Sequence, residues 1–131
     1  VLATYMYSVW RSADVVHYGN EIIALDGTLG MGKTVFTRAV IQALTQTDTD
    51  VPSPTFTLLQ TYDTPIGTLY HFDFYRLKHP DEAYEIGIED AFMDGICFIE
   101  WPEKIGSLLP KNAIHIVFSN TPDGRQIEIK D

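Results

Sequence analysis

The chain has 131 residues, which suits a single domain over residues 1–131, and 45% of them are hydrophobic, an ordinary globular composition. Its formal net charge is −9, so the surface repels phosphate backbones and independent binding of RNA or DNA is not expected. No apolar run is long enough to span a bilayer, no secretory signal is visible, and the single cysteine excludes an internal disulfide, so we expect a cytoplasmic protein with no membrane association.

The first readable elements are a strand, a glycine-rich loop and a helix. Residues 21–26 form a short, β-branched, apolar run typical of a buried strand. Residues 27–34, Gly-Thr-Leu-Gly-Met-Gly-Lys-Thr, match the phosphate-binding template G-x-x-x-x-G-K-[ST] at every fixed position. Residues 35–44 then place Phe36, Val40 and Leu44 on one helical face. Strand, glycine loop and helix are the arrangement that phosphate binding requires. The alternative is a glycine-rich turn that happens to precede a helix.

This loop carries the groups that hold a polyphosphate. Its glycines let the backbone curl so that successive N–H groups point at one anion, and the following helix adds its positive dipole end. Lys33 can reach the β- and γ-phosphates, and the Thr34 hydroxyl can ligate Mg²⁺. The residues predicted to bind the nucleotide here are Gly27, Leu29, Gly30, Met31, Gly32, Lys33 and Thr34.

The remaining elements alternate between short strands and short helices. Two prolines in residues 51–54 favour a stiff, extended loop. Strands are predicted at 55–62, 68–73, 96–100, 113–118 and 125–130, with turns at 63–67 and 120–124 that make two hairpins. Short helices are predicted at 81–84 and 86–93, and residues 102–109 are irregular or weakly helical. We interpret Tyr84 and Phe92 as core residues, and Cys97 as buried filler and not a catalytic thiol.

Two acids close apolar strands and are the candidate catalytic residues. Asp73 ends the run from Leu69, and Glu100 ends the run from Ile96. Ligands of open α/β sheets sit at the carboxyl ends of the strands, so both acids should converge with Thr34. There Thr34, Asp73 and Glu100 would handle Mg²⁺ or the attacking water. The alternative is a pair of surface acids where strands meet solvent. Spacing does not decide which acid holds the metal and which orients water.

Four other residues have two interpretations each. Thr55 is either a switch threonine that senses the γ-phosphate or metal, and so a nucleotide-binding residue, or the first residue of a strand. Arg76 contacts either phosphate or one of the many acids. His71 should share the face of Asp73, and we favour packing or a hydrogen bond to a site residue over catalysis. Trp101 is interpreted as a packing or interface residue and not as a base-stacking platform.

Four more segments, taken with the loop, resemble one family. They are Ser-Pro-Thr-Phe-Thr-Leu at 53–58, His-Phe-Asp-Phe-Tyr-Arg-Leu at 71–77, Glu-Ile-Gly-Ile-Glu-Asp at 85–90 and Ile-Glu-Trp-Pro-Glu at 99–103. In this order they resemble the TsaE (formerly YjeE) family, the small ATPase component of the bacterial machinery that makes threonylcarbamoyladenosine in tRNA. The family usually has Asp and Ala where this chain has Thr28 and Met31, neither of which is a fixed position of the template.

The resemblance implies a three-layer α/β, P-loop NTPase-like domain with a mixed β-sheet flanked by helices. It implies ATP and Mg²⁺ as ligands, with weak hydrolysis by the isolated chain. The implied partners are the TsaB and TsaD proteins of the threonylcarbamoyl transferase complex, and tRNA, modified at adenosine 37, would be met only through that complex. By position, Thr34 and Glu100 would serve Mg²⁺, Asp73 would be the second essential acid, and the segment 53–55 would act as a switch.

Three other functions remain open. A small-molecule kinase uses the same loop but usually adds a lid and an arginine-rich substrate site, and this chain has four arginines. A GTPase would need an N-K-x-D segment to read guanine, and the chain has none. A nucleotide-dependent interaction module without turnover of its own would use ATP only to set the shape of the loop at 53–55.

Overall fold

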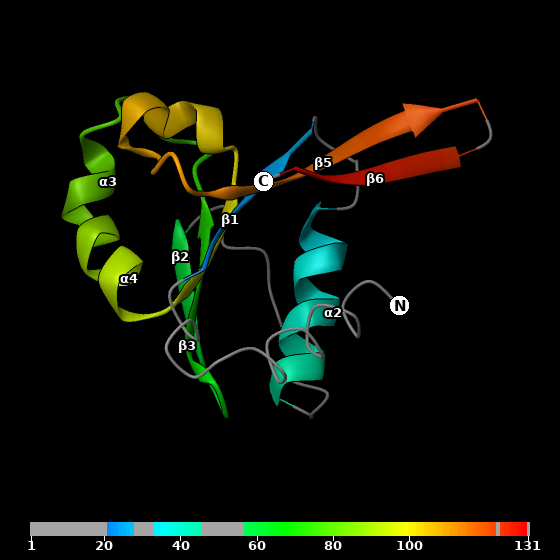
Figure 1. The fold of residues 1–131 in the computed structure, drawn as a ribbon. Coiled ribbons are helices and arrows are strands. Elements are labelled where there is room, and N and C mark those ends of the chain that lie inside the picture. Colours follow the sequence, from blue (N-terminus) through cyan, green and yellow to red (C-terminus); the bar gives the residue numbers. More distant parts are fainter. Residues whose placement is uncertain (1–20, 28–32, 46–56, 123, 131) are drawn as a thin grey trace.

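The computed structural model describes residues 21–27, 33–45, 57–122 and 124–130. Helices and strands make up most of these residues (Figure 1). In chain order they are β1 (Ile22–Asp26), α2 (Lys33–Thr45), β2 (Leu59–Thr64), β3 (Gly67–Asp73), α3 (Glu82–Glu85), α4 (Ile88–Asp94), β4 (Ile96–Glu100), the 3₁₀ helix η2 (Pro102–Leu108), β5 (Ile114–Thr121) and β6 (Gly124–Lys130).

The strands form one mixed six-stranded sheet in the order β2-β3-β4-β1-β5-β6. The four inner strands are parallel to one another, whereas β2 and β6 run antiparallel to their neighbours. Strand β1 lies between β4 and β5, and its first four residues are buried, as expected for a continuous apolar run in a parallel sheet. Because parallel strands end at the same edge, the carboxyl ends of β3, β4 and β1 lie together.

Helices cover both faces of this sheet, which gives three layers (Figure 1). Helix α2 packs one face with Phe36, Val40 and Leu44, against a cluster that includes Ile23 and Leu25 of β1. The neighbouring β1 residue Ile22 belongs to the cluster on the other face, beneath α3, α4 and η2. Alternation along a strand sends successive side chains to opposite faces, so β1 contributes to both cores. The predicted three-layer α/β fold with a mixed sheet is confirmed.

The two hairpins are longer than predicted, and their turns are shorter. The β2–β3 ladder continues to Thr64 and Gly67, which leaves a two-residue turn where residues 63–67 were predicted to turn. The Thr64 hydroxyl donates to the Gly67 carbonyl at 2.6 Å and accepts from the Ile66 N–H at 3.2 Å, so the threonine itself fastens the turn. Similarly, the β5–β6 ladder runs to Thr121 and Gly124.

The predicted strand at 55–62 is wrong at its beginning. Residues 55 and 56 lie outside the described residues, and β2 begins only at Leu59. Leu58 has a positive φ of 67°, which a strand cannot accommodate, and its carbonyl accepts a hydrogen bond from the Asp73 N–H at 3.0 Å. The strand therefore begins only after Leu58.

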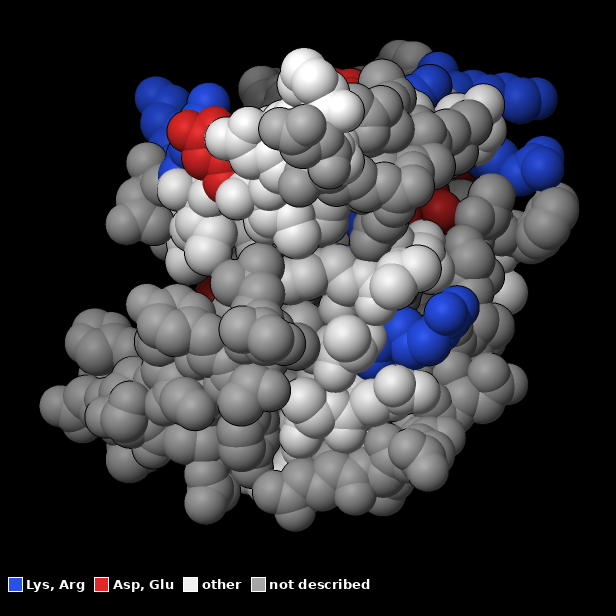
Figure 2. Space-filling model, turned by 90° about the vertical axis from the view of Figure 1, so that its right-hand side faces the viewer, with Lys and Arg blue, Asp and Glu red and all other residues white. Residues whose placement is uncertain are grey.

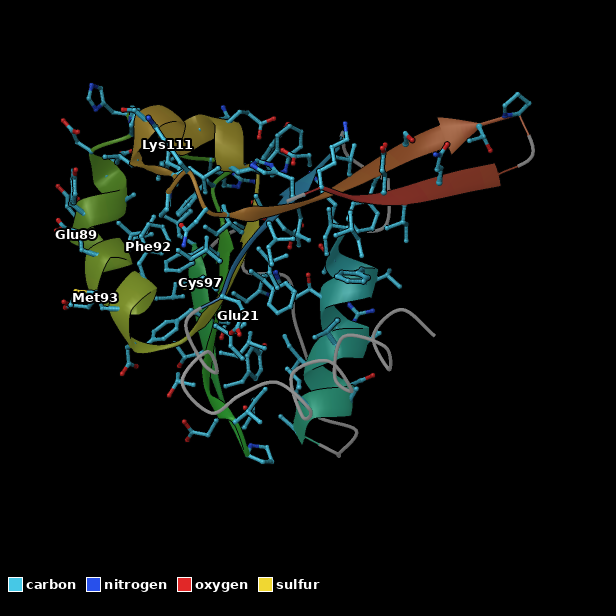
Figure 3. All side chains as sticks on the ribbon, in the orientation of Figure 1. Glu21, Glu89, Phe92, Met93, Cys97 and Lys111 are labelled. Atoms are coloured by element: carbon cyan, nitrogen blue, oxygen red, sulfur yellow. The ribbon has the colours of Figure 1, made fainter. Side chains whose placement is uncertain are left out.

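Helix α4 directs Ile88, Ala91 and Phe92 toward the core cluster and its acidic side chains and Met93 outward. Figure 3 shows Phe92 on the inner side of the helix and Glu89 and Met93 pointing away. Phe92 packs against the core cluster, as predicted, and Met93 is 81% exposed. The interpretation of Tyr84 as a core residue is wrong, because its side chain is 45% exposed and its neighbour Ala83 takes the buried position of α3.

Cys97 gives the first testable prediction. Its side chain is fully buried between α4 and the sheet (Figure 3), and burial raises the pKa of its thiol to about 12. Because the thiolate is the reactive form, the folded protein should not react with a water-soluble disulfide reagent at pH 8. The same reagent should titrate one thiol per chain in 6 M guanidinium, which serves as the control. Rapid reaction of the folded chain would contradict burial of Cys97.

Candidate functional site

The predicted site residues come from the carboxyl ends of three strands and the first turn of one helix. Lys33 and Thr34 begin α2, Gly27 follows β1, Asp73 ends β3, and Glu100 ends β4. Glu100 is paired with Asp73 on one side and with Leu25 on the other. The order of the strands in the sheet therefore brings Glu100 beside the end of β1, where the glycine-rich motif begins.

Thr34 and Glu100 meet directly. The Thr34 hydroxyl donates to the Glu100 carboxylate, at 3.0 Å from Oε1 and 3.3 Å from Oε2. Glu100 is only 3% exposed, and a carboxylate buried to this extent requires donors or a cation. A hydroxyl and a carboxylate oxygen side by side are ligands of the kind that Mg²⁺ accepts.

Lys33 lies beside this pair and is nearly buried. Its Nζ donates to the Gly27 carbonyl at 2.7 Å and lies 3.9 Å from the centroid of the Trp101 ring, so the ammonium group has a polar partner and a cation–π contact. Burial lowers the pKa of Lys33, and nearby acids, of which Glu100 is the strongest, oppose that effect. The side chain bridges the end of β1 and the residue after β4.

Asp73 is the second buried acid, at 3% exposed. Its Oδ1 accepts a hydrogen bond from the Tyr75 N–H at 2.9 Å, a turn-forming bond that fixes the carboxylate just beyond the strand. Because Asp73 is paired with Glu100 across adjacent parallel strands, both carboxylates lie on the same face of the sheet. That face is the one that α2 covers, since Leu69 of β3 and Phe98 of β4 belong to its cluster.

His71 and Trp101 contact two of the predicted site residues, Glu100 and Lys33 respectively. His71 is predicted either to pack or to form a hydrogen bond to a site residue; its side chain is buried, and its Nε2 lies 2.6 Å from Glu100 Oε2. Trp101 packs its ring against both Lys33 and the exposed Tyr75, whose ring centroid is 4.9 Å away. Trp101 also has a positive φ of 60°, a conformation that non-glycine residues rarely adopt.

Several predicted residues lie outside the part of the chain that the structure describes. Their roles remain predictions. These are Leu29, Gly30, Met31 and Gly32 of the motif, and the switch-like segment 53–55 with Thr55.

Sequence reasoning missed one pair at this edge of the sheet. His115 Nδ1 of β5 lies 2.6 Å from Asp26 Oδ2 at the end of β1, and both side chains are about one-third exposed. Asp26 closes an apolar strand just as Asp73 and Glu100 do, so the same rule would have selected it. Nothing local pointed to His115, which is 89 residues away in the chain.

The acids by themselves do not form a metal cage. Within the described ranges, no group of three or more His, Cys, Asp and Glu side chains is arranged to hold a metal ion. Mg²⁺ in nucleotide sites usually takes one or two carboxylates and fills the rest of its octahedron with hydroxyl, water and phosphate oxygens. Thr34 and Glu100 fit this requirement.

The basic side chains are scattered. On the face that Figure 2 shows, the described lysines and arginines stand in separate groups and form no continuous patch. Among the described residues, no helix is both long and apolar enough to cross a membrane.

Comparison with known proteins gives consistent matches. A family model described as "Threonylcarbamoyl adenosine biosynthesis protein TsaE" matches residues 3–127. The curated protein "tRNA threonylcarbamoyladenosine biosynthesis protein TsaE" of Rickettsia bellii is 45% identical over 82% of this chain and 75% of its own length. The protein of the same name in Haemophilus influenzae is 41% identical over 82% of this chain and 68% of its own length. The one in Bacillus subtilis is 36% identical over 79% of this chain and 64% of its own length.

A solved structure agrees with the fold. The crystal structure of Bacillus subtilis YdiB superposes with a TM-score of 0.68 at 27% sequence identity, covering 97% of this chain and 78% of that one. The residues that the family model matches, 3–127, include Lys33, Thr34, Asp73 and Glu100.

Proposed function

The chain belongs to the TsaE family of tRNA threonylcarbamoyladenosine biosynthesis proteins, with a P-loop NTPase-like fold, and from that premise we propose that it is an Mg-ATP-dependent ATPase. Hydrolysis would be weak in the isolated chain and would depend on TsaB and TsaD, the partners that the resemblance implies. The protein would serve that complex as an accessory subunit in the cytoplasm.

One observation carries the proposal. The hydroxyl of Thr34, the last residue of a complete phosphate-binding motif, is hydrogen-bonded to a buried carboxylate at the end of a parallel strand. A surface acid where a strand meets solvent would be exposed, whereas Glu100 and Asp73 are both buried. Buried acids beside the motif favour a nucleotide and metal site over a glycine-rich turn without function.

Each of these residues would have a distinct role. Thr34 and Glu100 would hold Mg²⁺, which when bound neutralises charge on the phosphoryl group that is transferred. Lys33 would exchange its contacts with the Gly27 carbonyl and Trp101 for the β- and γ-phosphates. Asp73, fixed by the Tyr75 N–H, would accept a hydrogen bond from the attacking water or from a metal-bound water.

The net charge of the chain is unfavourable for direct binding of tRNA. A net charge of −9, with scattered basic groups on the face in Figure 2, gives little electrostatic attraction for a phosphate backbone. We therefore expect contact with tRNA only through the complex.

Partner dependence is the test of this proposal. Phosphate release from ATP should be slow for the isolated chain and should rise about tenfold or more when TsaB and TsaD are added, a typical size for coupling between binding sites. In competition binding, unlabelled ATP should displace bound ATP, whereas GTP should displace it poorly. Absence of phosphate release with and without partners would indicate an interaction module, and ADP formation only with a small-molecule acceptor would indicate a kinase.

A further inference from the structure

The buried imidazole of His71 is the group that the proposed roles leave unused. Its side chain is 0% exposed, and its Nε2 lies 2.6 Å from Oε2 of the equally buried Glu100. The other carboxylate oxygen, Oε1, is the one closer to the Thr34 hydroxyl, at 3.0 Å against 3.3 Å for Oε2. The two oxygens of Glu100 therefore have different environments: imidazole holds one, and the other faces the first turn of α2.

The hydrogen-bonding capacity of the ring fixes the direction of this bond. An ionised carboxylate can only accept, so Nε2 carries the hydrogen and donates it. Nδ1 is buried and has no hydrogen-bond partner among the described residues. A hydrogen on Nδ1 would be a buried donor without an acceptor, whereas a bare lone pair costs less. The structure thus favours hydrogen on Nε2.

Sheet geometry explains why this particular residue reaches Glu100. His71 is paired with Phe98, two residues before Glu100 on the adjacent parallel strand, and all three lie on the face that α2 covers. Diagonal neighbours of this kind are within reach of a long side chain. Both His71 and Glu100 lie on interior strands of the sheet, at positions where the strand is buried.

Glu100 has a competing partner close by. Lys33 is buried near it, and of the neighbouring acids Glu100 has the strongest electrostatic effect on that lysine. A freely rotating Glu100 would turn toward the ammonium group of Lys33. The lysine could then no longer bind a polyphosphate, and the carboxylate could no longer bind its metal. The imidazole bond holds the carboxylate toward Thr34.

We propose that His71 is a positioning residue: it binds Oε2 of Glu100 and so keeps Oε1 directed toward Thr34 and the metal position, away from Lys33. This inference rests on the proposed ATPase function for its consequences in turnover, although the hydrogen bond itself can be tested without ATP. Partners of metal ligands that fix ligand orientation typically account for about 10- to 100-fold in metal affinity or activity.

The first test compares His71→Ala, His71→Gln and Leu69→Ala in the chain assembled with TsaB and TsaD. Gln can place its amide N–H near the position of Nε2, and Leu69 is a matched control because it is fully buried on the same face of the same strand. Steady-state ATP hydrolysis is measured at several Mg²⁺ concentrations, together with the melting temperature of each variant.

His71→Ala should lower kcat about 10- to 100-fold and raise the Mg²⁺ concentration needed for half-maximal activity, with the KM for ATP changed less than about threefold. His71→Gln should recover most of kcat. Leu69→Ala should lower the melting temperature without this loss of kcat. Equal kcat in the wild type and both His71 variants would overturn the inference, as would a folded His71→Gln variant no more active than His71→Ala.

The second test needs no turnover and separates failure of this inference from failure of the ATPase proposal. Long-range ¹H–¹⁵N correlation of the histidine rings, with His71 assigned from the signal lost in His71→Gln, should show hydrogen on Nε2 in the isolated chain. Glu100→Gln should shift that signal. Hydrogen found on Nδ1 and not on Nε2 would overturn the inference, as would a His71 signal whose chemical shift is the same in the wild type and in Glu100→Gln. A wild-type chain that never hydrolyses ATP but shows the expected signal would count against the proposed function only.

Discussion

Lys33→Ala should weaken the binding of Mg-ATP severely. The ammonium group is the cation at the beginning of α2, and a polyphosphate seated there would lose its paired charge in a buried setting. Leaving one partner of a buried charge pair unpaired costs about 2–5 kcal/mol, so affinity should fall by about 30-fold to several thousand-fold. Isothermal titration calorimetry of the folded variant measures this directly.

Two controls make that result specific. Lys104→Ala removes an exposed lysine of η2 and should leave affinity within about twofold, since a surface charge contributes little. Lys33→Met keeps most of the apolar side chain that packs beside Trp101, and it should lose binding as Lys33→Ala does. Micromolar binding retained by both Lys33 variants would remove this lysine from the phosphate site.

Glu100→Ala should retain ATP binding and lose turnover. The carboxylate is bonded to the Thr34 hydroxyl and would act on the metal and the transition state, whereas Lys33 and the main chain of the motif are proposed to hold the ground-state phosphates. Removing one preorganised electrostatic group from an active site commonly costs about 100- to 1,000-fold in kcat. Hydrolysis by the chain assembled with TsaB and TsaD, and calorimetry of the isolated variant, measure the two effects separately.

The matched control for this prediction is Glu103→Gln. Glu103 is an exposed acid of η2 that also acts electrostatically on Lys33, so its removal changes the local charge by the same amount without touching Thr34. Turnover should stay within about threefold, because exposed charges are screened. Glu100→Gln, which keeps the shape of the side chain, separates loss of charge from the cavity left by alanine. Unchanged hydrolysis in both Glu100 variants would exclude Glu100 from the site.

Local pattern determined the elements that carry the chemistry. The apolar runs that end at Asp26 and Glu100 form β1 and β4, and the amphipathic run that follows the motif forms most of α2. The motif that joins β1 to α2 defined a candidate phosphate-binding site. These features depend on periodicity and spacing within about a dozen residues, which a sequence displays directly. The position of Asp73 and Glu100 at strand ends also required only local reasoning, combined with the rule that parallel strands finish at one edge.

Only the tertiary structure decided which of these groups touch. The bond from His71 to Glu100 spans 29 residues and exists because β3 lies beside β4, and the bond from His115 to Asp26 spans 89 and exists because β5 lies beside β1. The positive φ of Leu58, just before β2, was likewise not visible in the sequence. Strand order follows from how two hydrophobic clusters are buried at once on opposite faces, a property of the whole sheet that no single segment encodes.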